Sequence, residues 1–123
     1  KFDFTQNGVT FHLRHGHGLD RTFDVRHRRW PRFIAGFVSR TEKVVAQIFG
    51  RRHLAFYRRE NEVLKLWKTK NFPVNDWLLC GHNHLAELDK VAKYANSGLF
   101  LSGNLASYLL VENGKINLHY ING

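Results

Sequence analysis

The sequence predicts an α/β fold in which packed β-sheets are flanked by helices. Strand-like runs occupy both ends of the 123-residue chain, whereas residues 24–70 carry few strand signals and space their apolar residues largely as helices do. Two Asn-Gly dipeptides, which favour two-residue hairpin turns, separate pairs of these strand-like runs. Because 43% of the residues are hydrophobic, the chain can form the core of a single domain.

The first element is a predicted antiparallel hairpin. Residues 1–6 and 9–14 flank Asn7-Gly8, whose two positions accept the positive φ angles of a tight turn. The second strand leads directly into His15, which is followed by two glycines and a further histidine, His17. A strand therefore ends in a group of potential metal ligands.

The middle of the chain, about residues 24–70, is a predicted helical insertion. Residues 41–49 begin with a capping threonine and end before Gly50, as a helix does. Residues 53–70 alternate apolar and charged residues with helical, amphipathic spacing. This segment fits either an ordinary helical pair with solvated basic faces or a binding surface.

The segment at 77–84 carries the main functional signal. Trp77 to Cys80 predicts a short strand buried on both faces, and Gly81 allows a tight exit. Side chains two residues apart in an extended segment point the same way, so His82 and His84 can reach one site. Imidazole is the commonest protein metal ligand. The other histidines, His12, His27, His53 and His119, are more simply surface or hydrogen-bonded residues.

The last third of the chain predicts short strands. After His84, residues 85–89 are expected to cross outward, and residues 93–96 and 98–101 are expected to be short strand pieces. Residues 107–111 and 115–120 form a predicted hairpin about Asn113-Gly114.

The composition limits the partners and the compartment. A net charge of +9 and a pI near 10.1 favour an anionic partner such as phosphate, nucleic acid or anionic lipid. Arginines around Trp30, namely Arg26, Arg28, Arg29 and Arg32, suit the surface of an anionic bilayer. A single cysteine excludes an internal disulfide, and no apolar run is long enough to span a membrane. We expect a cytoplasmic protein that attaches peripherally to an anionic membrane surface.

Several motifs in order resemble a known family. Gly81-His82-Asn83-His84 resembles the Gly-His-x-His signature of calcineurin-like metallophosphoesterases, and His15-Gly16 resembles the family's preceding histidine motif. Asn96-Ser97-Gly98 resembles the Asn-x-Gly turn that follows, and residues 107–116 resemble the closing hairpin. The run from His15 to Asp20 before a helical insertion is most similar to UDP-2,3-diacylglucosamine hydrolases of lipid A synthesis.

The resemblance implies a metallophosphoesterase-type fold and a hydrolase with two divalent ions. The expected ion is Mn²⁺, although imidazole ligands also suit Zn²⁺ or Fe²⁺. The substrate class is a phosphoanhydride or phosphoester, with UDP-2,3-diacylglucosamine hydrolysed to lipid X and UMP. The helical insertion would form a cap over this acylated nucleotide-sugar.

The resemblance also assigns roles to individual residues. His15 and His82 would bind one metal and His84 the other, whereas His17 would face the substrate phosphate. Asp20 would orient a histidine. Basic and polar residues of the insertion would hold the substrate, and these are Arg58, Arg59, Asn61, Lys65 and Lys68.

The family's earlier motifs, Asp-x-His, Gly-Asp and Gly-Asn-His, do not precede His15 in this sequence. The chain therefore resembles the C-terminal half of such an enzyme, and we expect it to be inactive alone and to self-associate or pair with a complementary half. Two other classes fit the composition. One is a basic nucleic-acid-binding module, and the other is a non-catalytic metal-binding interaction domain.

Overall fold

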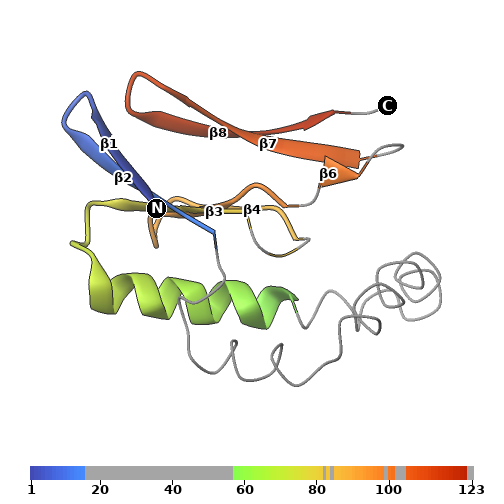
Figure 1. Cartoon of the computed structure of the whole chain (residues 1–123), viewed down its shortest axis with the longest axis horizontal. Helices are drawn as coiled ribbons and strands as arrows, with labels where there is room; N and C mark the ends of the chain where they lie inside the picture. The colour runs from blue at the N-terminus through green and yellow to red at the C-terminus, as the bar shows by residue number, and fades with distance from the viewer. Residues whose placement is uncertain (16–56, 82, 84, 99, 102–104, 122–123) are drawn as a thin grey trace.

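The computed structural model describes residues 1–15, 57–81, 83, 85–98, 100–101 and 105–121. Within these residues the chain forms a five-stranded mixed sheet, a three-stranded antiparallel sheet and a helical segment at 57–71 (Figure 1). This confirms the mixed α/β fold class. The predicted helix at 41–49 lies outside the described residues.

The five-stranded sheet has the order β1-β2-β3-β5-β4. Its strands are β1 (Phe2–Gln6), β2 (Val9–Arg14), β3 (Trp77–Cys80), β4 (Glu87–Asp89) and β5 (Tyr94–Asn96). Strands β2, β3 and β5 run parallel to one another. The outermost strands, β1 and β4, each run antiparallel to their neighbour. The short strand β4 corrects our expectation that residues 85–89 only form a connection.

The three-stranded sheet consists of β6 (Phe100–Leu101), β7 (Leu105–Glu112) and β8 (Lys115–Ile121). The β7–β8 turn holds Asn113 at φ 51° and Gly114 at φ 74°, and the β1–β2 turn holds Asn7 at φ 50° and Gly8 at φ 75°. Both turns need positive φ at two successive positions, which asparagine and glycine accept best. Both predicted hairpins are therefore confirmed.

The five-stranded sheet is the middle layer of the molecule. The β6–β8 sheet lies on one side of it and the helical segment on the other (Figure 1). Between the sheets, Phe11, Trp77, Leu79 and Ala95 pack with Ile116 of β8. On the other face, Leu78, Cys80 and Tyr94 pack with Leu64 of the helical segment.

Strand β3 contributes to both of these cores, because successive strand residues point to opposite faces. All four of its residues are buried, as the continuous apolar run predicts.

The helical segment confirms the predicted amphipathic helix over the part of 53–70 that is described. It continues to residue 71, and Pro73 follows the end of the helix, where a residue without an N–H cannot extend it. Within the described residues, no helix is long and apolar enough to cross a bilayer.

His12 links its own strand, β2, to β1 and to the segment that leads into β3. Its Nδ1 lies 3.0 Å from Asp3 Oδ1 on β1, and its Nε2 lies 3.0 Å from Asp76 Oδ2, just before β3. The ring also stacks on Phe72 with 3.8 Å between centroids. The interpretation of His12 as a hydrogen-bonded structural residue is confirmed.

Asp3 makes the attachment of β1 sensitive to acid. Hydrogen bonds from Arg14 and from His12 lower its pKa from 3.8 to about 2. A lowered carboxyl pKa stabilises the fold fully above the unfolded-state value, and this contribution is lost as the pH falls toward about 2. We predict that Asp3→Asn lowers stability at neutral pH and makes the loss of stability between about pH 4 and pH 2 shallower.

Urea unfolding at a series of pH values measures this effect, with Glu112→Gln as a control at an exposed carboxyl. Identical pH profiles for Asp3→Asn and the wild-type chain would contradict it.

Candidate active site

Three strand ends from distant parts of the sequence meet at one edge of the central sheet. The register pairs Arg14 of β2 with Cys80 of β3, and Cys80 with Asn96 of β5. Because these strands are parallel, the residues that follow them emerge at the same edge. These residues are His15, Gly81 and Ser97, and all three line one hollow of about 540 Å³. The end of β2 that leads into His15 and the end of β3 that leads into Gly81 therefore lie side by side in one sheet.

Two glycines at this edge lie in close contact with neighbouring segments. A Cβ atom on Gly81 would lie 3.1 Å from Ser97 Oγ, so the chain leaving β3 packs closely against the chain leaving β5. Gly98 has φ 73°, and a Cβ there would lie 2.8 Å from Ser107 Oγ and 2.9 Å from Ala86 Cβ. The Asn-x-Gly turn thus combines a conformation that favours glycine with a close approach that excludes a side chain.

A buried cluster of polar side chains lies at this edge and comes from the helical segment, from β5 and from the chain after β3. Asn61 Oδ1 accepts hydrogen bonds from Asn83 Nδ2 at 2.7 Å, from the Tyr94 hydroxyl at 2.8 Å and from Asn96 Nδ2 at 3.1 Å. Asn96 Nδ2 also donates to Asn83 Oδ1 at 2.9 Å. We call Asn61, Asn83, Tyr94 and Asn96 the amide cluster. Its three asparagines and Tyr94 are at most 2% exposed.

The amide cluster also holds the backbone on both sides of the edge. Asn83 Oδ1 accepts the N–H of Leu85 at 3.2 Å, and Asn96 Oδ1 accepts the N–H of Gly98 at 2.9 Å. Asn83 stands between His82 and His84 in the sequence. The cluster therefore fixes the residue between two predicted ligands to both the helical segment and β5.

Burial perturbs three titratable groups near this edge. It raises the pKa of Glu60 from 4.5 to about 7, against the opposing effect of a hydrogen bond with Asn83. Burial also raises the pKa of the Cys80 thiol to about 12 and raises the pKa of Tyr94. Cys80 is thus a protonated, buried side chain rather than a nucleophile.

The predicted metal ligands are described only in part. His15 is exposed and borders the hollow beside Gly81. His17, Asp20, His82 and His84 lie outside the described residues. Among the residues that are described, no three histidine, cysteine or acidic side chains are grouped so that they could hold a metal ion. The metal assignment stays a prediction.

The residues expected to hold substrate lie in the helical segment in two different settings. Arg58 and Arg59 are exposed. Asn61 belongs to the amide cluster, and Lys68 is 2% exposed and donates to the carbonyl of Val74 at 2.9 Å. Burial lowers the pKa of Lys68.

Lys65 pairs with three acids, namely Glu62 at 2.8 Å, Glu87, and Asp89 at 3.0 Å. Asn61, Lys65 and Lys68 therefore make internal contacts that stabilise the fold, and their role in substrate binding stays a prediction.

The sequence reasoning missed the amide cluster and Glu60. One signal for the amide cluster was present in the sequence. Asn61, Leu64 and Lys68 recur at helical spacing on one face, so polar residues share a stripe with a core leucine. Tyr94 and Asn96 likewise lie two residues apart on a short strand and face the same side. Polar residues at buried positions need partners, which points to a shared hydrogen-bonded network.

Comparisons with protein-family models, with curated protein sequences and with solved structures found no match for this chain.

Removing the shared acceptor of the amide cluster should destabilise the fold. We predict that Asn61→Ala lowers the free energy of unfolding by about 3 kcal/mol, because three buried donors lose their common partner. Asn71→Ala is the matched control, since its amide is exposed and donates to the carbonyl of Trp67 in the same helical segment. Denaturant unfolding compares the two variants, and equal losses would contradict a central role for Asn61.

Glu60 should make stability fall as the pH rises. Its raised pKa means that the folded state holds a proton that the unfolded state releases, so stability decreases from about pH 4.5 to about pH 7. The loss amounts to at most about 3 kcal/mol. We predict that Glu60→Gln removes this loss and leaves the variant more stable than the wild-type chain at pH 8. Thermal unfolding with a chelator present measures it, and parallel pH profiles would contradict it.

Proposed function

We propose that this chain forms the histidine-bearing half of a metal-dependent phosphoesterase with the packed sheets of the calcineurin-like family. The observation that supports the proposal is the meeting of His15, Gly81 and the Asn96-Ser97-Gly98 turn at one sheet edge. These segments carry the motifs that the family uses in the same order. A central sheet covered by a second sheet on one face and by a helix on the other also agrees with such a fold.

Within this proposal His15 and His82 bind one divalent ion and His84 binds the other, with Mn²⁺ as the expected ion. When bound, two such ions supply the charge that activates water and neutralises the phosphoryl group during hydrolysis. His17 contacts the substrate phosphate, and Asp20 orients a histidine. The amide cluster fixes Asn83, so the backbone between the two histidines is anchored before any ligand binds.

The remaining ligands of a two-metal site have to come from another segment, because this sequence lacks the family's Asp-x-His, Gly-Asp and Gly-Asn-His motifs before His15. Open apolar surface beside the site supports a complementary segment there. Phe2 is 61% exposed and Leu13 is 43% exposed, and both line the hollow that borders His15.

A phosphate-bearing substrate fits the charge of the chain. The net charge is +9, and Arg58 and Arg59 are exposed at the start of the described part of the helix. The resemblance to UDP-2,3-diacylglucosamine hydrolases makes an acylated nucleotide-sugar the substrate that we propose, hydrolysed to lipid X and UMP at the inner face of the inner membrane.

Metal binding by the full 123-residue chain tests the proposal. We predict that the wild-type chain binds Mn²⁺ in calorimetric titration and that His84→Ala weakens this binding by about tenfold or more, because a direct ligand is removed. His119→Ala is the matched control. His119 lies on β8, where its ring stacks on Tyr108 with 5.1 Å between centroids.

Two results would contradict the proposal. One is a wild-type chain that binds no divalent ion, and the other is equal affinity in the His84→Ala and His119→Ala variants. Oligonucleotide binding that survives chelation and falls steeply with salt, in a chain that binds no metal, would instead favour the basic nucleic-acid-binding module.

A further inference from the structure

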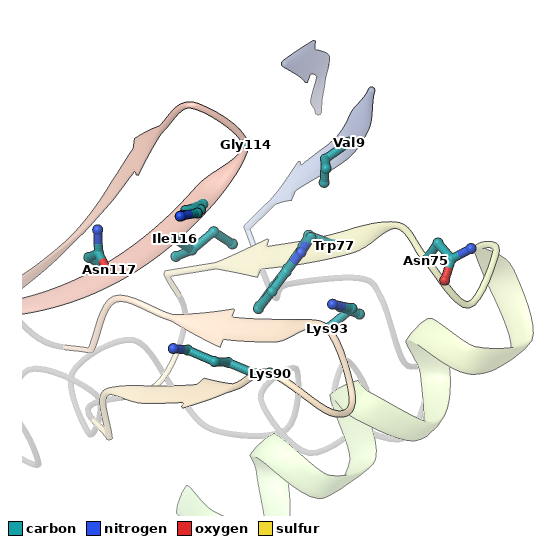
Figure 2. Close-up of a pocket in the computed structure, with 9 residues that line it drawn as sticks. Val9, Asn75, Trp77, Lys90, Lys93, Gly114, Ile116 and Asn117 are labelled. Carbon is teal, nitrogen blue, oxygen red and sulfur yellow. The ribbon is translucent and has the colours of Figure 1, made fainter. Parts of the chain in front are cut away.

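A second hollow lies at the opposite edge of the central sheet. Its volume is about 480 Å³, and it extends between the start of the parallel strands and the start of β8 (Figure 2). Trp77 and Ile116 line it with apolar surface. The polar residues that line it are Asn75, Lys90, Lys93, Lys115 and Asn117. We call this hollow the lysine pocket.

The lysine pocket carries uncompensated positive charge. Its lining contains three lysines and no acidic residue. Within the described part of the chain, none of the three lysines forms an ion pair with a carboxylate, including Glu112, which is opposite Lys115 in the register.

Two other acids near the lysines in sequence, Asp89 and Asp76, are engaged elsewhere. Asp89 pairs with Lys65 and accepts the N–H groups of Val91 and Ala92, and Asp76 contacts His12. Three lysines in the lining of one hollow attract an anion, because no acidic residue in that lining offsets their charge.

Lys93 occupies an unusual backbone position. Its φ is 54°, in the left-handed region that is unfavourable for a long side chain. The other non-glycine residues described with positive φ, Asn7 and Asn113, are asparagines, which accept this conformation more readily. The Lys93 ammonium lies 5.3 Å from the centroid of the Trp77 ring. An asparagine would adopt this φ angle more readily than a lysine does. The turn nevertheless carries Lys93, whose ammonium lies over the aromatic ring that lines the pocket.

We propose that the lysine pocket binds a small, soluble phosphate-bearing anion. Lysine ammonium groups bind phosphate as point charges, and the side-chain amides of Asn75 and Asn117 can donate further hydrogen bonds to its oxygens. An anion with several negative charges uses all three lysines, whereas a single carboxylate does not. This site lies at the amino ends of β3 and β5, away from the histidine edge, and it does not depend on the proposed metal site.

The test is a titration of the full ¹⁵N-labelled chain with pyrophosphate in the presence of a chelator, and NMR chemical shifts monitor the binding. Saturable shifts should centre on the backbone amides of Lys93, Lys115 and Asn117 and on the Trp77 indole. We predict that acetate binds more weakly and that added salt weakens pyrophosphate binding.

Two variants and one control sharpen this test. Lys93→Asn removes a charge and places at φ 54° a residue that tolerates it, so the turn is retained. Lys115→Gln removes a second charge from the exposed face of β8. Each should raise the Kd for pyrophosphate about fivefold. Lys70→Gln, at an exposed position at the end of the helical segment, should leave the Kd within about twofold of the wild-type value.

Three outcomes would overturn the proposal. They are an unchanged Kd in both Lys93→Asn and Lys115→Gln, an acetate affinity equal to that of pyrophosphate, and shifts that centre on His15 and Gly81 instead. Because the chelator removes divalent ions, each of these outcomes is separate from success or failure of metal binding at the histidine edge.

Discussion

The parallel pairing of β2 with β3 is the interaction on which the rest of the structure depends. Its register places Arg14 beside Cys80, so that His15 and Gly81 leave the sheet at the same edge although they are far apart in the sequence. An antiparallel pair would send these two residues to opposite edges. Burial of β3 stabilises this pairing. All four of its residues are buried, and the side chains on its two faces pack into two different cores.

The parallel strands also give the sheet two chemically different edges. At the carboxyl edge, buried amides bind one another and the backbone, so the segments that follow β3 and β5 are anchored by Asn83 and Asn96. At the amino edge, lysines surround a hollow without acidic lining residues. Under the two proposals made above, metal ions at the carboxyl edge and ammonium groups at the amino edge would each bind phosphate oxygens.

The elements that the sequence predicted well are those governed by local physical rules. Asn7-Gly8 and Asn113-Gly114 mark the hairpins because their φ angles are positive, and Trp77 to Cys80 reads as a buried strand because it is apolar throughout. The amide cluster was missed because hydropathy alone predicts that a polar side chain such as Asn61 is solvated, whereas tertiary hydrogen bonds allow it to be buried on the same helix face as Leu64. Strand β4 was missed because three residues carry too little pattern, and only pairing with β5 defines it.

We propose that a divalent metal ion binds at the carboxyl edge of the parallel strands. Paramagnetic broadening tests it most directly, because Mn²⁺ broadens the NMR signals of the amides nearest to it. Substoichiometric Mn²⁺ added to the ¹⁵N-labelled chain should broaden the amide signals of His15, Gly81 and Ser97 first and leave those of Lys93 and Asn117 sharp. Broadening that is uniform along the chain, or that centres on the amino edge, would contradict the account.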